Sequence, residues 1–208
     1  MRWTVQRAIG VLFVVGQLVA GALLYGQLPA RVVTHWAGTT DPGAALPRLL
    51  VVVGMPMFTL AAFGFLLVAP RLNPSHATSE SFWWIYEWFA VTVAGLLTYV
   101  QTVVLAANLG HVVPLSTALP PALGIVWISL GSVVGRAEPD WVVSLRVPWL
   151  LPDGEPWEVT HRVGGWLLRG AGVVSALAAR TEYGLLVAFV SPVVATLLTL
   201  AYSHRRWG

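Results

Sequence analysis

Residues 135–169 read GRAEPDWVVSLRVPWLLPDGEPWEVTHRVGGWLLR and separate two long apolar regions of the chain. This stretch holds five of the nine acidic residues, four of the twelve arginines and four of the eleven tryptophans. On either side the sequence is apolar for about twenty residues at a time, which is the length that an α-helix needs to cross a bilayer. The pattern predicts a polar segment, rich in tryptophan, that joins membrane helices.

The composition of the whole chain is that of an integral membrane protein. Of its 208 residues, 57% are hydrophobic and 10% are charged, which leaves too few charges to cover the surface of a soluble domain. The mean hydropathy of +0.74 and the repeated apolar runs place the chain in a bilayer. Because a helix satisfies its backbone hydrogen bonds internally, the predicted fold class is all-α, a polytopic membrane helix bundle.

Six transmembrane helices are expected, in two parts of three spans each, residues 1–110 and residues 111–208. The fourth helix is expected to begin at Pro120, because proline suits the first turn of a helix. An external loop, residues 29–48, follows the first span, and a cytoplasmic loop, residues 136–162, follows the fourth. The expected spans cover about residues 8–28, 49–69, 88–109, 120–135, 163–179 and 184–202.

The distribution of arginines predicts the orientation. An even number of spans puts both termini on one side of the membrane. If that side is the cytoplasm, it carries eight arginines against three outside, with Arg169 left out as membrane-embedded, in agreement with the positive-inside rule. Arg2 and Arg7 before the first apolar run also fit a signal peptide. The run continues to Leu28, however, which favours an uncleaved first helix and cytoplasmic termini.

The cytoplasmic loop holds candidate residues for binding a ligand or a partner protein. A helix over about residues 156–166 would place Trp157 and His161 on one face, at i,i+4 spacing. The apolar segment before it, about residues 142–151, is too short to span a bilayer and fits an interfacial or re-entrant segment. Alternatively, the tryptophans and arginines only anchor this helix at the interface. The candidate residues are Arg146, Pro148, Trp149, Trp157, Thr160, His161, Arg162, Gly164 and Gly165.

The fifth span carries an arginine and many small residues. An arginine at mid-bilayer costs about 2.5–3.5 kcal/mol, so Arg169 should either reach the cytoplasmic interface or find a partner inside the bundle. Glu87 is one candidate partner. The small residues, among them the pair Gly172 and Ala176, let neighbouring backbones approach closely. This predicts a central position for the helix.

The external loop holds a second group of candidate residues. It is rich in turn-forming residues, so it either caps two helices as an ordered turn or forms a face that meets an extracellular ligand. In the second case Trp36 would be the aromatic anchor. The candidate residues are Pro29, His35, Trp36, Gly38 and Asp41.

Patterns typical of enzymes or metal sites are weak in this chain. Glu158 and His161 have the i,i+3 spacing of a carboxylate–histidine metal site, but such sites need further glutamates from other helices, and the spans do not supply them. Glu158 also pairs with Arg162 at i,i+4 spacing. The chain has no cysteine, and no catalytic motif or basic block for nucleic acid is found. The sequence predicts a non-enzyme that has no metal, cofactor or direct nucleic-acid partner.

Two motifs resemble those of a known family. The SdpI family, integral membrane proteins associated with immunity to a secreted toxic peptide, has a cytoplasmic pattern close to Gly-Ile-Arg-Thr-Pro-Trp-Thr-Leu, followed by Trp-x-x-Thr-His-Arg-x-Gly-Gly. The matching residues here are 144–151, which read SLRVPWLL, and Trp157, Thr160, His161, Arg162, Gly164 and Gly165. The external loop resembles a domain of unknown function that often precedes this family, through Leu28, Pro29, Val32 or Val33, His35, Trp36, Gly38 and Asp41.

The resemblance implies a function with two linked activities. In the founding system the protein neutralises a toxin at the membrane and, when the toxin is bound, sequesters a cytoplasmic repressor. The departures from the pattern concern hydrogen bonding, because both threonines beside the Pro-Trp pair are replaced, by Val147 and Leu150. The expected partners are therefore the lipid bilayer, a peptide toxin and a cytoplasmic repressor. The alternative is a non-catalytic subunit of a membrane transport or export complex.

Overall fold

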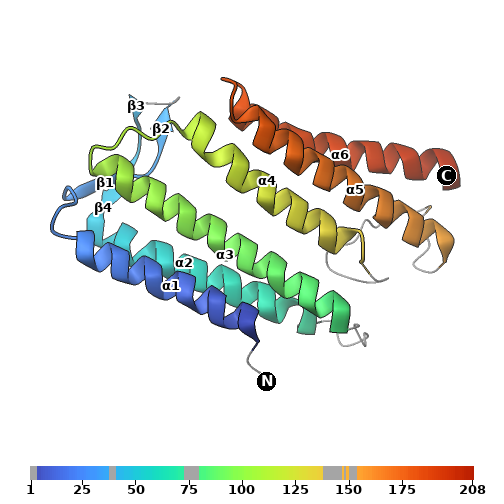
Figure 1. Cartoon of the computed structure of the whole chain (residues 1–208), viewed down its shortest axis with the longest axis horizontal. Coiled ribbons are helices and arrows are strands. Elements are labelled where there is room, and N and C mark those ends of the chain that lie inside the picture. Colours follow the sequence, from blue (N-terminus) through green and yellow to red (C-terminus); the bar gives the residue numbers. More distant parts are fainter. Residues whose placement is uncertain (1–3, 38–40, 73–79, 138–146, 148, 150–153) are drawn as a thin grey trace.

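The computed structural model describes residues 4–37, 41–72, 80–137, 147, 149 and 154–208. Figure 1 shows an elongated bundle of long helices with a few short strands at one end. The helices in the described residues are α1 (Val5–Leu24), α2 (Arg48–Val68), α3 (Glu80–Asn108), α4 (Leu115–Val134), α5 (Glu155–Ala178) and α6 (Gly184–Trp207). The shorter elements are the strands β1 (Arg31–Val33), β2 (Trp36–Ala37), β3 (Asp41–Pro42) and β4 (Ala45–Pro47), and the 3-10 helix η1 (Ala69–Leu72).

The protein is a multi-pass membrane protein, as its composition predicts. Five of the helices, α1, α2, most of α3, α4 and α6, are long and apolar enough to cross a bilayer. Many apolar side chains on these helices are exposed in the bundle, including Leu12, Phe58 and Phe65, as expected for surfaces that meet lipid chains. The helix α5 is less apolar, because its first half carries Glu155, Glu158 and Arg162 and its second half carries Arg169.

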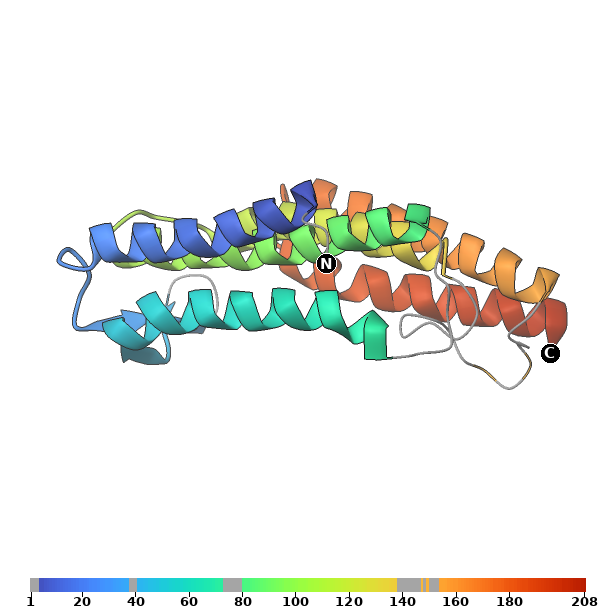
Figure 2. The same cartoon turned by 90° about the horizontal axis from the view of Figure 1, so that it is seen from below.

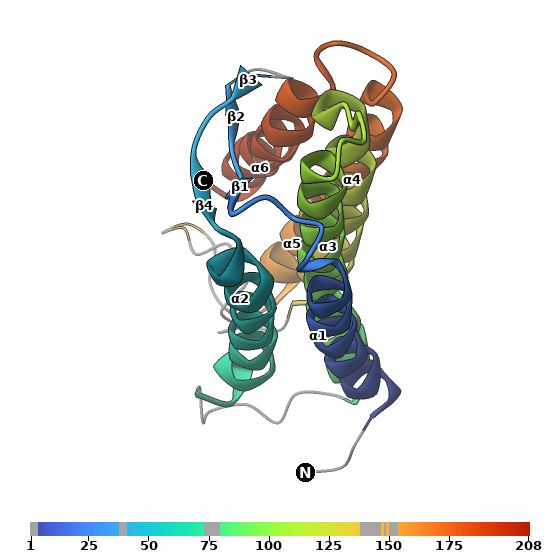
Figure 3. The same ribbon diagram turned by 90° about the vertical axis from the view of Figure 1, so that its left-hand side faces the viewer.

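Helices α1, α2 and α3 pack against one another, and α4, α5 and α6 do the same (Figures 1 and 3). Contacts between α3 and α4 join these two groups. Successive helices alternate in direction (Figure 2). The first residues of α1 therefore lie beside the start of α3, where Thr4 bonds to Glu87, and α6 also ends at that end of the bundle.

Close contacts between α4 and α5 explain the run of small residues in α5. A Cβ atom on Gly165 would lie 2.5 Å from the carbonyl oxygen of Gly131. About two turns further along, a Cβ atom on Gly124 would lie 2.5 Å from the carbonyl oxygen of Gly172. Because a side chain at these positions would collide with backbone, the glycines allow the two helices to approach closely. The close packing predicted for this helix is confirmed, since α5 packs extensively against both α4 and α6, whereas the helix that contacts the first group, through α3, is α4.

Three predicted helix boundaries are wrong. The separate helices expected at about residues 156–166 and 163–179 form one continuous helix, α5, because Gly164 and Gly165 pack inside the bundle without breaking it. The helix α4 begins at Leu115, one and a half turns before Pro120. The helix α3 begins at Glu80 and not near residue 88, because its first aromatic side chains pack against the end of α4.

Buried polar side chains connect the first three helices. Gln17 on α1 donates to the hydroxyls of Thr59 on α2, at 3.1 Å, and of Thr98 on α3, at 2.6 Å. Gln101 donates to the backbone oxygen of Gln17 at 3.2 Å. These bonds fix the rotation of the three helices about their axes, because a polar group left unpaired in an apolar bundle is costly.

The segment that follows α1 forms strands where turns were expected. Strand β1 pairs with β4, and β2 pairs with β3, both antiparallel. The side chain of Asn108, the last residue of α3, accepts from the N–H of Val33 and donates to its carbonyl oxygen, both at 2.8 Å. Arg48 donates to two backbone oxygens at the end of α1. The strands are thus attached to three helices at the end of the bundle opposite the termini.

Candidate functional site

One candidate site lies at the end of the bundle that carries the termini. We call it the inner site, and it consists of Trp149, Trp157, Thr160, His161 and Ser203. The rings of Trp157 and His161 stack with centroids 4.0 Å apart, so the shared face predicted for them is confirmed. His161 is only 1% exposed, and its Nδ1 lies 2.9 Å from the carbonyl oxygen of Trp157. Because a carbonyl can only accept, Nδ1 carries a proton. His161 precedes the apolar part of α5, and its burial lowers its pKa, which favours the neutral ring.

The indole of Trp157 ties α5 to the end of α4. Its Nε1 donates to the carbonyl oxygen of Ala137 at 3.0 Å, and the side chain is almost fully buried. Ala137 lies three residues after the end of α4, so a movement of α4 along its axis would change this bond.

Ser203 of α6 joins the two remaining members of the inner site. The Nε1 of Trp149 donates to its hydroxyl at 3.1 Å, and the hydroxyl of Thr160 lies 3.4 Å away. The ring of Trp149 also packs edge-on against His204, with centroids 4.8 Å apart. Trp149 is therefore attached to α6. The sequence-based prediction missed Ser203, although Thr199 and Ser203 place two hydroxyls at i,i+4 spacing on one face of the last helix.

The other predicted residues of this loop have different surroundings. A Cβ atom on Gly164 would lie 3.0 Å from the Thr199 side chain, so Gly164 lets α5 approach α6. Arg162 is exposed and forms the predicted i,i+4 ion pair with Glu158, at 3.8 Å. Arg146 and Pro148 lie outside the described residues.

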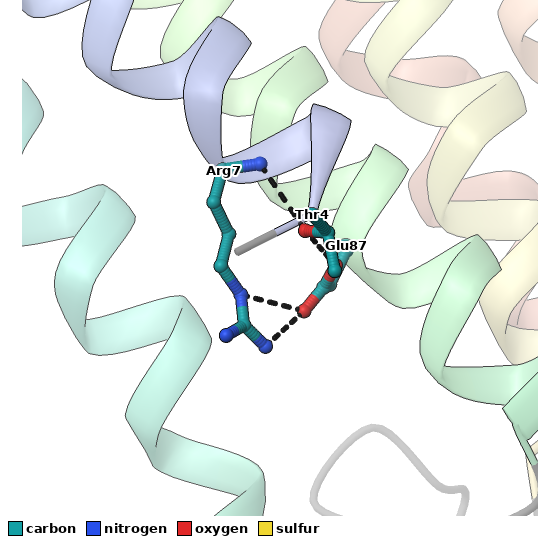
Figure 4. A network of polar contacts seen from close by, with 3 residues as sticks. All are labelled: Thr4, Arg7 and Glu87. Atoms are coloured by element: carbon teal, nitrogen blue, oxygen red, sulfur yellow. Dashed lines mark hydrogen bonds and ion pairs between the residues drawn. The ribbon is translucent and has the colours of Figure 1, made fainter. Parts of the chain in front are cut away.

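The prediction that Glu87 could pair with Arg169 is wrong. Figure 4 shows that Glu87 instead binds Arg7 and Thr4 of the α1 end. Arg7 donates from Nε at 2.9 Å and also from Nη2, and the Thr4 hydroxyl donates at 2.7 Å. Glu87 is 4% exposed. The pairing follows from the packing of α1 along α3, which brings together residues 80 positions apart in the sequence.

A second polar contact also joins the start of α1 to the start of α3. With its amide oriented to suit both indoles, the side-chain oxygen of Gln6 accepts from Nε1 of Trp84 and Nε1 of Trp88, each at 3.2 Å. Trp84 and Trp88 on α3 therefore bind the first turn of α1. This junction was not predicted from the sequence.

At the opposite end, the predicted residues of the external loop lie on or beside the strands. Trp36 packs against a cluster that includes Leu28 and Val32. It also lines a hollow of about 380 Å³, together with residues 107 and 110–116 at and around the α3–α4 connection. Pro29 and His35 are exposed. The Asp41 backbone pairs with Ala37, and Gly38 lies outside the described residues.

The described residues contain no group of three or more histidines and carboxylates that could hold a metal ion. The inner site offers instead a stacked Trp–His pair, two hydroxyls and exposed charges beside them. The stacked pair and both hydroxyls are buried, so a partner protein could meet only the exposed charged side chains beside them.

Comparisons with known proteins agree with this arrangement. The family model described as the SdpI/YfhL protein family matches residues 136–203, which include all of α5, most of α6 and every residue of the inner site. The chain is 24% identical to the Immunity protein SdpI of Bacillus subtilis (strain 168) over 204 residues, which cover 96% of this chain and 95% of that protein. No solved structure matches the chain. The resemblance to the SdpI/YfhL family noted in the sequence is therefore confirmed, through the match over residues 136–203 and the similarity to the Bacillus subtilis protein.

Proposed function

We propose that this protein is an immunity protein that recognises a peptide toxin, or a related ligand, at its outer end and alters its inner site in response. The observation that carries the proposal is that the family-matched segment, residues 136–203, forms the buried contacts of Trp149, Trp157 and Ser203. The similar protein of Bacillus subtilis is named an immunity protein, which supports the same function.

The helix α4 offers a direct connection between the two ends. Its first residues, Leu115 and Ser116, line the hollow beside Trp36. Its last turn is followed by Ala137, which binds Trp157. A ligand that filled the outer hollow in only one position of α4 would favour that position. The glycine contacts between α4 and α5 would permit a small shift, and the hydrogen bond of Trp157 would transmit it.

The surface that would meet a cytoplasmic repressor surrounds the inner site. Glu158 and Arg162 are exposed on α5, and His204, Arg205 and Arg206 are exposed at the end of α6. A shift of Trp149 against Ser203 and His204 would change the shape of this surface. We infer that repressor binding depends on that shape as well as on charge.

A complementation experiment tests the immunity function. The chain is expressed in Bacillus subtilis that lacks its Immunity protein SdpI, and these cells are grown together with the parent strain. We expect the wild-type chain to improve survival, His161→Ala and Trp36→Ala to abolish the gain, and the exposed variant Glu182→Gln to retain it. Equal survival with all three variants, at equal membrane levels, would contradict the assignment of both sites.

The same strains distinguish the alternative function. If the protein were a subunit of a transport or export complex, a stoichiometric membrane partner would co-purify in detergent from cells that make no toxin. An immunity protein should purify without such a partner.

A further inference from the structure

Two arginines meet where α4 ends beside α5. The guanidinium group of Arg169 lies against Gly135, since a Cβ atom there would be 3.7 Å from Nη2. Arg136 is the next residue and donates back to the carbonyl oxygen of Ser132 at 3.3 Å. The two positive charges are close enough to repel each other electrostatically. The fold therefore holds two cations together at the inner end of the membrane-spanning part of α4.

Neither arginine has an acidic partner within the described part of the chain. The ion pairs there join Arg7 to Glu87 and Arg162 to Glu158. Arg169 instead donates from Nε to the carbonyl oxygen of Gly165 at 3.1 Å and lies over the ring of Trp166, 4.0 Å from its centroid. Two adjacent cations near lipid are costly, and an anion bound to both would offset that cost.

An apolar groove begins at Trp166, whose ring lies beneath the guanidinium group of Arg169. Trp166 is 64% exposed and lines one end of a groove of about 540 Å³ between α5 and α6. The hydroxyl of Ser191 in this groove already bonds to Ser175 and to the carbonyl oxygen of Ala171. The other residues that line the groove are apolar, and they include Gly170, Val174, Val190 and Val194.

We propose that Arg136, Arg169 and Trp166 bind the head group of an anionic phospholipid, with one acyl chain in the groove between α5 and α6. The two guanidinium groups supply paired donors for phosphate oxygens, and Trp166 suits the boundary between head group and hydrocarbon. A zwitterionic lipid would bind more weakly, because its ammonium group is repelled by both arginines. The bound lipid would stabilise the contact between α4 and α5 next to the inner site.

Native mass spectrometry of the full chain in mild detergent tests the proposal. Delipidated protein is mixed with phosphatidylglycerol or with phosphatidylcholine, and retained lipid is counted. We expect the wild type to retain phosphatidylglycerol preferentially. Because one arginine near an anionic surface contributes about fivefold in affinity, each of Arg136→Gln and Arg169→Gln should lower retention by about that factor. The double variant should lose the preference, and Arg136→Lys with Arg169→Lys should restore part of it.

Two controls make the result specific. Arg205→Gln removes an exposed positive charge from the same end of the chain and should retain the preference. A Cβ atom on Gly170 would meet no atom within 4 Å, so Gly170→Leu should fold normally while filling the groove. It should weaken binding of long-chain phosphatidylglycerol and leave binding of its short-chain analogue unchanged.

Three results would overturn the proposal. They are equal retention of both lipids by the wild type, an unchanged preference in the double arginine variant, and displacement of phosphatidylglycerol by inorganic phosphate at equal concentration. The last would assign the arginines to a soluble phosphate. A thermal unfolding curve that matches that of the wild type checks that each variant is folded.

Discussion

Ser203 is the residue whose environment depends most on distant parts of the chain. Its hydroxyl accepts from Trp149, 54 positions earlier, and lies beside Thr160 on α5. The side chain is fully buried, so its loss would leave the indole N–H of Trp149 without this acceptor. Because Trp149 is partly buried, the loss of this hydrogen bond costs about 0.5–1.5 kcal/mol.

We therefore expect Ser203→Ala to lower the free energy of unfolding by about that amount and to release Trp149. Thermal unfolding in detergent and quenching of tryptophan fluorescence by an aqueous quencher measure the two effects. Ser132→Ala is the matched control, because among the described residues the Ser132 hydroxyl bonds only to a carbonyl of its own helix. Similar results for both variants would show that Ser203 does not hold Trp149.

Glu87 is a buried charge whose contribution to the free energy of unfolding depends on its partner. It binds Arg7 and Thr4 while only 4% exposed. Removing one partner of a buried ion pair costs about 3–5 kcal/mol, because the other charge stays buried.

We expect Glu87→Gln to destabilise the protein by about that amount and to make the first turn of α1 susceptible to protease. Limited proteolysis and thermal unfolding measure the effect. Glu182→Gln, which neutralises an exposed carboxylate, should change neither. A stable Glu87→Gln variant with a protected N-terminus would contradict a role for this pair in docking α1.

At the scale of the elements, α4 and α5 form the contact on which the proposed function depends. Glycines at positions 124, 131, 165 and 172 let their backbones approach closely. The hydrogen bond from Trp157 to Ala137 then joins the two helices beyond this contact. Any movement of α4 relative to α5 would therefore take place at these glycines.

We expect Gly165→Ala to separate α4 from α5, because its Cβ atom would lie 2.5 Å from the Gly131 carbonyl oxygen and from Gly135. Overpacking of this kind costs about 1–3 kcal/mol, and immunity should fall with it. Gly170→Ala on the same helix has open space and should behave as the wild type in thermal unfolding and in the survival assay. A fully active Gly165→Ala variant would count against α4 as the connecting element.

At the scale of the whole molecule, we propose six membrane spans with both termini in the cytoplasm. Five helices meet the criteria of length and hydropathy. The sixth, α5, packs along α4 and α6 and runs opposite to both (Figure 1). A helix held between two spanning neighbours would cross the membrane with them, and its charged first turns would remain at the inner surface.

The absence of native cysteine makes this topology directly testable. We expect Glu182→Cys, between α5 and α6, to react with a membrane-impermeant maleimide in intact cells. Arg205→Cys, near the end of α6, should react only after the cells are opened. Labelling of both residues from the same side would show that α6 does not cross the membrane, and labelling with the sides exchanged would reverse the proposed orientation.

The sequence by itself determined the helical membrane class, the approximate position of most spans and the family motif around Trp157 and His161. These properties depend on local hydrophobicity and on spacing within one helix, and both can be read along the chain. The i,i+4 stacking of Trp157 on His161 was predictable for the same reason.

Only the tertiary structure decided which distant residues meet. The pairing of Arg7 with Glu87, the attachment of Trp149 to Ser203 and the clamp of Asn108 on Val33 join residues 80, 54 and 75 positions apart. The continuity of α5 through Gly164 and Gly165 also depends on neighbours, because packing against α4 and α6 stabilises a helix that glycines alone would weaken. The partners of a buried polar group are set by which helices lie side by side, and local sequence does not encode that choice.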